Sequence, residues 1–498
     1  MTPSHSRFAW FKAVVRVALF TGCLSAQSLC AFDYEDVPAD RLPPSGWEDV
    51  QWADPGSWIA IDVTQWGMIP NDHSVDIIDK VNDIFAAYPT GNLLLEFPAG
   101  VFKVYSDMVM SRDNVRLRGQ GSGSTEIIIS MSSTSVGGVS FLGGGFVGSA
   151  IAVTNSPVMG ADHVYADDTT LDVGDFVQLY LEDDPYGAHD NSGNYFYGQI
   201  FEITNIDRAE HKIFFDQKLG LDFPADYLPH LQEIDMLQNV GIEQMKVRRA
   251  RHNDDGSFGV DNISMRYVNN GYVKQVESKN SSNTHIAFKY CINVIAEEND
   301  VHDSFLYDGG YGYGIVANLC TTKARISNNK LWNLRHHVLL QKGANHCVIS
   351  YNSLEPDFIN NTNSLCLHGH FPHNNLMEGN MLHQGLADNA WGANGPANTW
   401  FRNYATEEVG AINQDTHDQN LIGNILKTIW AQGTNHYLGA NQYESGWVNW
   451  GDISSVAVLP ESLYLAVEPA FMSGYDWPVY GPDVSSWGIQ NVLPAYDR

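Results

Sequence analysis

The stretch "SLCLHGHFPHNNLMEGN" (364–380) places three histidines, His368, His370 and His373, within six residues. Histidine has an ordinary pKa close to neutral pH, so it can take or give a proton and can also ligate a metal. The chain has only 18 histidines in 498 residues, so the cluster marks a candidate site. A single histidine in a turn is more often a solvated or hydrogen-bonded residue than a catalytic one. Which of the two applies here depends on the elements that surround the cluster.

Composition narrows the class of protein. Charged residues make up 17% of the chain, aromatic residues 12%, and there are 44 glycines. This favours an all-β protein with many turns over a coiled coil or a disordered chain. The net charge of −30 argues against general nucleic-acid binding. Residues 240–345 nevertheless carry a small excess of Lys and Arg, which either attracts an anionic ligand or is ordinary local variation.

A weak repeat runs from about residue 239 to residue 430. Short β-rich runs such as "ARISNN", "VISYN" and "LMEGN" each end in a turn with an asparagine, at spacings of 19 to 30 residues. A repeat of this size without helical periodicity predicts stacked β-helix coils, about 4.8 Å apart. The asparagines expected to stack in these turns are Asn280, Asn299, Asn329, Asn352, Asn380, Asn403 and Asn424.

The segment 59–128 precedes this repeat. It contains a short strand, an amphipathic stretch at 74–87, "LLLEFPAGVFKV" and "MVMSRDNVRLRGQG". This succession resembles the N-terminal part of the pectate-lyase superfamily of carbohydrate-active proteins. The resemblance implies an all-β, right-handed parallel β-helix whose first end is capped by a helix. It implies a fold and leaves the reaction open.

The remaining segments complete the expected organisation. Residues 1–31 read as a signal peptide, with "AVVRVALFTG" (13–22) as its apolar core. We therefore expect a secreted or periplasmic protein, with lipoprotein processing at Cys23 as the alternative, and no membrane span. The expected units after it are an N-terminal cap with the first coils (32–149), a small antiparallel β insertion (150–235), the main coils (236–440) and a closing segment over the end of the coil (441–498).

Four cysteines follow the predicted signal peptide: Cys291, Cys320, Cys347 and Cys366. They form no CxxC pair, which argues against a zinc ribbon. Export permits disulfides between them, but we expect four buried thiols without disulfides.

Aligning the coils on their asparagines predicts a column of reactive side chains along one side of the coil. The predicted catalytic residues are His337, His368, Tyr307, Asp303, Asp308 and Asp388. The predicted substrate-binding residues are His285, Trp332, Arg335, His336, Lys342, His370 and Trp391. The aromatic side chains of Trp332, Trp391, Tyr307 and Tyr313 suit the apolar faces of sugar rings, so the expected partner is a polysaccharide.

Two reactions fit these residue types. The first is β-elimination on a uronic-acid polymer, in which a base removes the proton at C5. His337, His368, Tyr307, Arg335 and Lys342 supply that chemistry, and Ca²⁺ on Asp303 and Asp308 is a possible cofactor. The second is inverting glycoside hydrolysis by paired carboxylates from Asp303, Asp308 and Asp388.

The choice between these reactions stays open. The Asp-Asp and Gly-His-Gly motifs of the polygalacturonase branch are absent, and no Arg-centred pectate lyase motif can be identified. A zinc site on His368 and His370 is a third alternative, although no HExxH motif is present. A non-catalytic polysaccharide-binding or adhesive β-helix is the fourth. We expect cleavage of an acidic polysaccharide, with elimination slightly preferred and oligomeric state undetermined.

Overall fold

The structure is a computed structural model that describes residues 41–130, 138–167, 170–250, 261–355, 363–406 and 459–498, with shorter stretches between 409 and 443. The predicted signal peptide lies outside the described residues. No described helix is long and apolar enough to cross a membrane.

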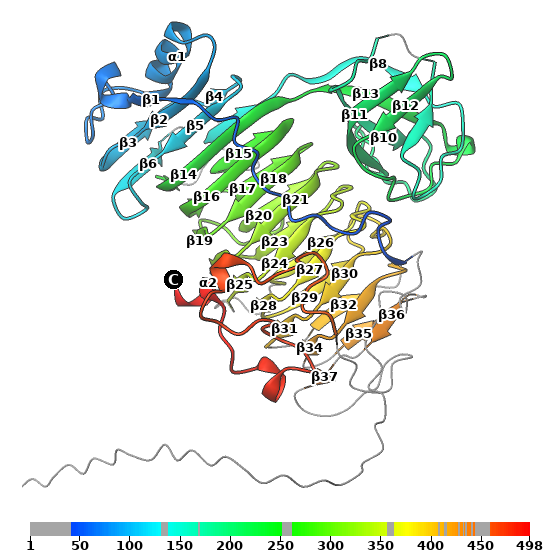
Figure 1. The fold of residues 1–498 in the computed structure, drawn as a ribbon. Helices are drawn as coiled ribbons and strands as arrows, with labels where there is room; N and C mark the ends of the chain where they lie inside the picture. Colours follow the sequence, from blue (N-terminus) through cyan, green and yellow to red (C-terminus); the bar gives the residue numbers. More distant parts are fainter. Residues whose placement is uncertain are drawn as a thin grey trace, which may run out of the picture.

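The chain winds into a right-handed parallel β-helix, as the sequence predicted (Figure 1). Each coil contributes strands to three ladders, which we call sheets 1, 2 and 3. Sheets 2 and 3 meet at a sharp turn and share the long strands β14 (Leu237–Arg249) and β16 (Val268–Ser281). From sheet 3 a loop of variable length returns the chain to sheet 1 of the next coil.

Sheet 1 is ten-stranded and carries the candidate site described below. Its strands are β4 (Met108–Met110), β7 (Val139–Leu142), β15 (Ile263–Arg266), β17 (Thr284–Lys289), β20 (Tyr313–Asn318), β23 (His336–Leu340), β26 (Leu365–His368), β29 (Gly385–Asp388), β32 (Val409–Ile412) and β35 (Ile429–Ala431).

Sheets 2 and 3 form the other two sides of the coil. Besides β14 and β16, sheet 2 contains β1 (Trp58–Asp62), β2 (Asn92–Glu96), β5 (Val115–Arg118), β18 (Ile292–Glu297), β21 (Thr322–Ser327), β24 (Val348–Ser350), β27 (Leu376–Glu378), β30 (Thr399–Phe401), β33 (Asn420–Ile422) and β36 (Tyr437–Gly439). Sheet 3 contains β3 (Gly100–Val104), β6 (Thr125–Ile129), β19 (Asp300–Ser304), β22 (Lys330–Trp332), β25 (Ser353–Leu354), β28 (Met381–Leu382), β31 (Tyr404–Ala405), β34 (Ile425–Leu426) and β37 (Gln442–Tyr443).

Alternation along the sheet 1 strands separates the core from the outer face. Ala317, Leu340 and Leu367 are paired across β20, β23 and β26 and belong to the apolar core of the coil. The residue after each of them therefore points outward. Because sheet 1 is parallel and evenly spaced, outward side chains from successive coils stand in columns.

An asparagine ladder closes the turn between sheets 2 and 3. The Nδ2 of Asn329 donates to Oδ1 of Asn352 at 2.9 Å, and the same bond recurs along the coils. The predicted asparagines from Asn299 to Asn424 all take part. Asn280 is not part of this ladder, so its inclusion in the prediction was wrong. In its coil the backbone N–H of Val276 donates to Oδ1 of Asn299 at the position where the next coils have an asparagine. A second buried ladder, including Asn375 and Asn398, was not predicted.

The first end of the coil is capped as expected. The helix α1 (Ile77–Ala87) buries one face against the core through Ile77, Val81 and Ile84. Short helical turns lie at η3 (Val63–Trp66), η4 (Ala225–Tyr227), η5 (Ala470–Met472) and η6 (Ser485–Gly488), and the chain ends in α2 (Pro494–Asp497).

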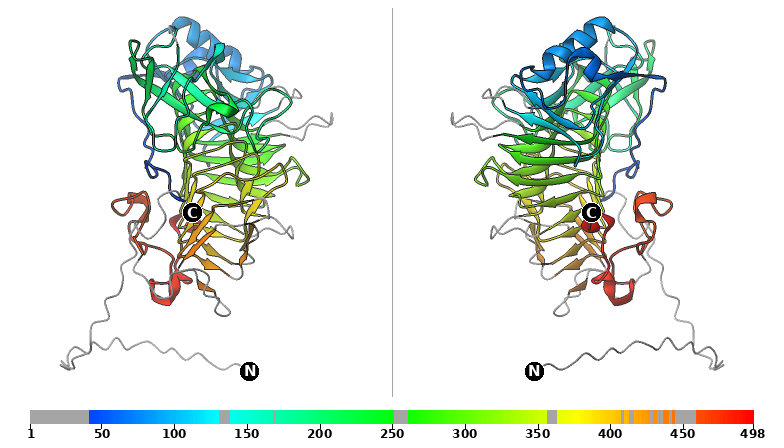
Figure 2. Two further views of the ribbon diagram at one scale, coloured as in Figure 1. Left: turned by 90° about the vertical axis from the view of Figure 1, so that its right-hand side faces the viewer. Right: turned by 90° about the vertical axis from the view of Figure 1, so that its left-hand side faces the viewer.

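The predicted antiparallel insertion leaves the coil between β7 and β14 (Figures 1 and 2). Its six strands are β8 (Gly145–Ala152), β9 (His163–Tyr165), β10 (Phe176–Leu181), β11 (Gly198–Asp207), β12 (Lys212–Phe215) and β13 (Pro229–Asp235). It packs on the coil through Tyr197, whose ring stacks on Phe371 at 4.7 Å, and through a 2.6 Å bond from the Tyr290 hydroxyl to Asn194. The insertion therefore stands beside the turn that follows sheet 1.

The described parts of both terminal segments cover the flank of sheet 2 and leave sheet 1 open (Figure 2). The N-terminal segment is anchored by Trp47, whose indole donates to the Asn374 carbonyl at 2.7 Å. The closing segment is anchored by Arg402, which binds both carboxylate oxygens of Asp483 at 2.7 Å. The described part of this segment (459–498) thus lies along the flank, whereas the sequence placed it over the end of the coil.

The four cysteines of the described residues, Cys291, Cys320, Cys347 and Cys366, are buried and free. Burial raises the pKa of Cys291, Cys320 and Cys347 to about 12, so these thiols are protonated at neutral pH. The prediction of buried thiols without disulfides is confirmed for these four cysteines.

Candidate active site

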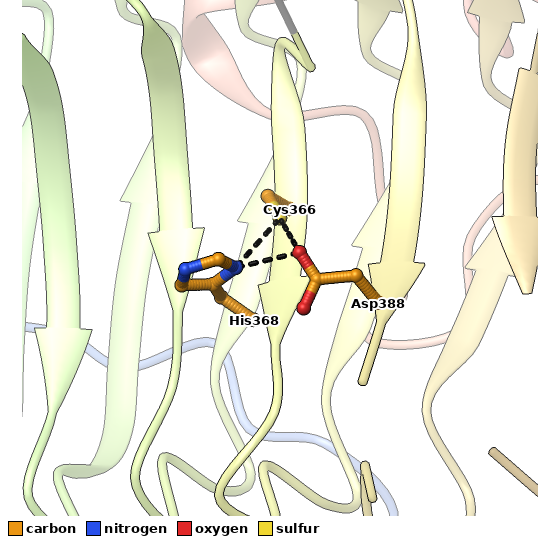
Figure 3. A group of neighbouring side chains, drawn as sticks. All are labelled: Cys366, His368 and Asp388. Atoms are coloured by element: carbon orange, nitrogen blue, oxygen red, sulfur yellow. Dashed lines mark hydrogen bonds and ion pairs between the residues drawn. The ribbon is translucent and has the colours of Figure 1, made fainter. Parts of the chain in front are cut away.

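A histidine–carboxylate pair stands on the outer face of sheet 1. His368 ends β26 and is the register partner of Asp388, which ends β29. The Nδ1 of His368 lies 2.6 Å from Oδ2 of Asp388 (Figure 3). Only 9% of His368 and 8% of Asp388 is exposed, so solvent screens this bond weakly. Burial opposes ionisation of Asp388, but the bond from His368 keeps its pKa below the ordinary value.

The second nitrogen of His368 is held by a tryptophan. The Nε1–H of Trp391 lies 3.1 Å from Nε2 of His368. An indole nitrogen can only donate, so Nε2 must be the acceptor and Nδ1 must carry the proton that Asp388 binds. Asp388 therefore sets the tautomer in which Nε2 is the basic nitrogen. Trp391 itself is 58% exposed and stacks on His370 at 5.9 Å.

Cys366 lies beside the pair and completes the metal-ligand cluster that the described residues contain (Figure 3). Its Sγ is 3.7 Å from Oδ2 of Asp388 and 3.9 Å from Nδ1 of His368. Two ligands on one zinc at about 2.1 Å would lie about 3.4 Å apart in a tetrahedral site, which is well above the His368–Asp388 distance. Burial also raises the pKa of Cys366 far above its usual value, which disfavours the thiolate that a metal needs. The geometry fits a hydrogen-bonded pair better than a metal site.

One side of the pair is formed by His336, Tyr313 and Arg335. The ring of His336 lies 5.8 Å from that of His368 and stacks on Tyr313 at 5.5 Å. Its Nδ1 donates to the Asn363 carbonyl, while Nε2 has no partner among the described residues. Burial, with Arg335 nearby, lowers the pKa of His336 to about 3, so this ring is neutral. Arg335 donates to the Tyr313 hydroxyl at 3.0 Å.

The other side is formed by Lys342, His370 and the insertion. Lys342 follows β23, and its ammonium lies 5.6 Å from the centre of the Phe196 ring of the insertion. The same ring contacts His370 at 5.2 Å. Burial, with Lys342 nearby, lowers the pKa of His370 to about 4, so it is neutral at physiological pH. Lys342 is thus the cation on this side.

Arg335 and Lys342 differ from most basic residues of the 240–345 stretch. Eight of those residues lie within 4 Å of a carboxylate: Lys246, Arg248, Lys274, Lys279, Lys289, Lys323, Arg325 and Lys330. In the described part of the chain Arg335 and Lys342 have no such partner; Arg335 contacts Tyr313, and Lys342 contacts Phe196. Their positive charges are therefore available to an anionic ligand.

Two of the predicted site residues lie on a different side of the coil. Asp303 belongs to β19 of sheet 3, where it accepts from Asn333 at 2.6 Å and pairs with Lys279 at 3.3 Å. Trp332, on β22, stacks on His302 at 4.2 Å. The side chains of 285–391 therefore do not form the single column that the alignment predicted.

Two predicted histidines face the interior. His285 lies beside Ser278, whose register partners Val247 and Val301 belong to the apolar core. His337 is in register with Gly314, where a side chain would meet the core residues Leu331 and Leu334. Neither histidine has exposed surface. His285 bonds to Ser278 at 2.9 Å and to Ser304 at 3.3 Å, and burial lowers its pKa to about 3. The structure gives both a position inside the coil, where a polymer cannot reach them.

Two further predicted residues lie in a loop and not on a strand of sheet 1. Tyr307 and Asp308 are in the loop between sheets 3 and 1, and Asp308 is exposed. The structure shows no contact between Asp303, Asp308 and Asp388, so it supplies no paired carboxylates from this set. His373, the third histidine of the cluster, is buried against the insertion and lies 3.2 Å from the Gly198 carbonyl.

Cys366 was not among the predicted site residues, and Tyr313 was predicted only as an aromatic side chain that suits sugar rings. The Tyr313 hydroxyl oxygen accepts from Arg335 at 3.0 Å and from the Gly310 N–H at 3.2 Å. Tyr313 immediately precedes the apolar run "GIVA". That run predicts a strand, and a residue at its start lies at the edge of the sheet.

No protein-family model matches the sequence, and a search of the curated proteins finds no match. Solved structures are similar in fold. The tailspike protein gp49 from Pseudomonas phage LKA1 is 12% identical, with 80% of this chain and 81% of that chain covered and a TM-score of 0.54. The tailspike gp61 from Pseudomonas phage phi297 is 13% identical, with 78% and 68% covered and a TM-score of 0.55. These similarities confirm the parallel β-helix that the family resemblance implied.

Proposed function

We propose that the chain cleaves an acidic polysaccharide by β-elimination, with His368 as the general base. The observation that carries this proposal is the His368–Asp388 pair on the open face of sheet 1, between Arg335 and Lys342. A chain of net charge −30 would repel a polyanion, so cations without carboxylate partners at this position favour an acidic ligand.

The reaction follows from the tautomer of His368. Nε2 takes the proton from C5 of a uronate ring, and the electron pair of the broken C–H bond forms the C4–C5 double bond. The C4–O bond breaks, and the departing oxygen takes up the proton from the imidazolium. Asp388 stabilises the imidazolium that forms between these two transfers. Arg335 or Lys342 pairs with the uronate carboxylate and stabilises charge that develops beside C5.

Trp391 must move during this reaction, because its N–H occupies Nε2 of His368. Its exposed ring suits the apolar face of a sugar, and stacking there would draw the indole away from the histidine. Trp391 therefore has two functions in the proposal: it binds a sugar ring, and it covers the base when no substrate is bound.

A substrate panel tests the proposal. The purified protein is incubated with pectate, alginate, glycosaminoglycans, ulvan, carrageenans and neutral glucans, while ultraviolet absorbance of unsaturated ends and new reducing ends are followed together. Elimination predicts that both signals rise on an acidic glycan. Reducing ends alone would support the hydrolase alternative, and binding without products would support the non-catalytic alternative. A parallel series with EDTA tests whether the reaction needs calcium.

A further inference from the structure

A row of outward-pointing polar side chains continues from the His368–Asp388 pair along sheet 1. The register pairs Arg266 with Lys289 and Lys289 with Asn318. Ala317 pairs with Leu340 and Leu340 with Leu367, so Asn318, Gln341 and His368 follow one another in the same column. We call Arg266, Lys289, Asn318 and Gln341 the polar row. At about 4.8 Å for each coil, Arg266 stands about 19 Å from His368.

The middle of the polar row has unused hydrogen-bonding capacity. The Oδ1 of Asn318 is buried and has no partner among the described residues. The side-chain amide of Gln341 makes no hydrogen bond within the described part of the chain, although its backbone is fully paired. An amide offers donors and an acceptor together, which matches the hydroxyl groups of a sugar.

The far end of the polar row carries a free cation. Lys289 is neutralised by Asp261 at 2.5 Å. Arg266 is exposed and has no carboxylate within 4 Å among the described residues; its guanidinium lies over Tyr267 at 4.9 Å and donates to the Tyr267 hydroxyl at 3.0 Å. Arginine binds carboxylate and sulfate groups through paired N–H donors.

The insertion borders this row on one side. Tyr267 and Tyr290 follow Arg266 and Lys289 in sequence and stack at 5.2 Å, and Phe146 of the insertion packs on both. The insertion therefore borders the polar row at its far end through Phe146 and near His368 through Phe196, which contacts Lys342 and His370. An extended chain that leaves His368 in this direction is guided toward Arg266.

We infer that Arg266 forms a distal subsite for a carboxylate or sulfate of the bound polymer. Asn318 and Gln341 bind the sugar hydroxyls between this subsite and His368. This inference rests on the proposed function and adds to it a preference for long acidic chains. Short oligosaccharides bound at His368 would not reach Arg266, so its contribution must depend on chain length.

The test compares binding of short and long acidic oligosaccharides. Size-fractionated oligogalacturonates and oligomers of alginate are titrated by calorimetry into the H368Q protein, in which turnover is blocked. The R266Q substitution in that background should weaken binding of the longest oligomers roughly ten-fold and leave the shortest unchanged. Q341A should weaken the binding of oligomers of intermediate length. R208Q, which removes an exposed arginine of the insertion, is the matched control and should have no effect at any length.

The outcomes separate this inference from the proposed function. Equal binding of long oligomers by R266Q and its parent would overturn the distal subsite while leaving the role of His368 intact. An equal loss at every length would also overturn it, because the effect would then be one of general charge. Absence of binding to every acidic oligomer by the parent would reject the proposed function together with the subsite.

Discussion

His368 and Asp388 face each other across neighbouring strands, with Nδ1 of the histidine 2.6 Å from Oδ2 of the carboxylate. The pair resembles a base and its orienting group more than a metal site, because Trp391 occupies Nε2 and fixes the proton on Nδ1. A general base of this kind depends on the carboxylate for its tautomer and for stabilisation of its charged form.

The D388N substitution should therefore lower kcat about a hundred-fold or more while changing KM little. An amide at this position cannot stabilise the imidazolium as a carboxylate does. Steady-state kinetics on the acidic glycan identified in the panel would measure the effect. D303N is the matched control, because Asp303 lies on sheet 3 and pairs with Lys279. A greater loss of kcat in D303N than in D388N would contradict the assignment of Asp388 as the partner of the base.

The W391F substitution should expose the basic nitrogen of His368. Phenylalanine keeps an aromatic ring but lacks the N–H that donates to Nε2. Carbethoxylation of His368 by diethyl pyrocarbonate, followed by peptide mass spectrometry, should become several-fold faster. W332F is the control, because the Trp332 indole donates to Asp300 on the other side of the coil. Equal rates of His368 carbethoxylation in W391F and in the parent protein would show that the indole does not protect the histidine.

Removal of either unpaired cation should weaken recognition of the substrate's acid groups. R335Q and K342Q should each lower kcat/KM about ten-fold on the free-acid polymer, because a carboxylate then loses a charged partner. The loss should be smaller on a methyl-esterified polymer, which has no charge to pair. K80Q, on α1 at the end of the coil, serves as control. Equal losses on both polymers would argue against a role in binding the uronate carboxylate.

Stability should fall as pH rises through the range in which Glu378 ionises. Burial raises the pKa of Glu378 from 4.5 to about 7, while its oxygens accept from the Tyr351 hydroxyl and from the Leu463 N–H of the closing segment. Because the folded pKa lies above the unfolded one, the favourable contribution is complete below pH 4.5 and is lost by about pH 7.

The ionisation of Glu378 should cost on the order of 3 kcal/mol at high pH. The E378Q variant should lose most of this pH dependence, as measured by denaturant midpoints across the range. E96Q, at an exposed position of β2, should retain it. A pH profile of E378Q that matches the parent would show that another group is responsible.

The fold was predictable because buried asparagines leave a visible repeat. Each of the asparagines from Asn299 to Asn424 bonds to its neighbours, so the turn cannot vary freely in sequence. The capping helix was visible through its apolar spacing. The position of the closing segment was not predictable, because the residues that anchor it, Arg402 and Glu378, lie far from it in sequence.

The candidate site was predictable only in part, for a geometric reason. The asparagine alignment holds through sheet 3, which follows the turn directly. It fails at sheet 1, since the intervening loops differ in length: Ser304 and Tyr313 bound one, and Trp332 and His336 bound the next. His368, Asp388 and Trp391 were selected by residue type and come together, whereas Asp303 was aligned with them and lies on another side.

The most direct measurement is the release of unsaturated products from an acidic polysaccharide by the H368Q protein and its parent. Absorbance of the new double bond is followed under saturating substrate, and binding of the polymer is measured in parallel. We expect the parent to form unsaturated ends, and H368Q to bind the polymer with similar affinity but to form these ends at least about a hundred-fold more slowly. Undiminished formation of unsaturated ends by a folded H368Q protein would contradict the assignment of His368 as the base.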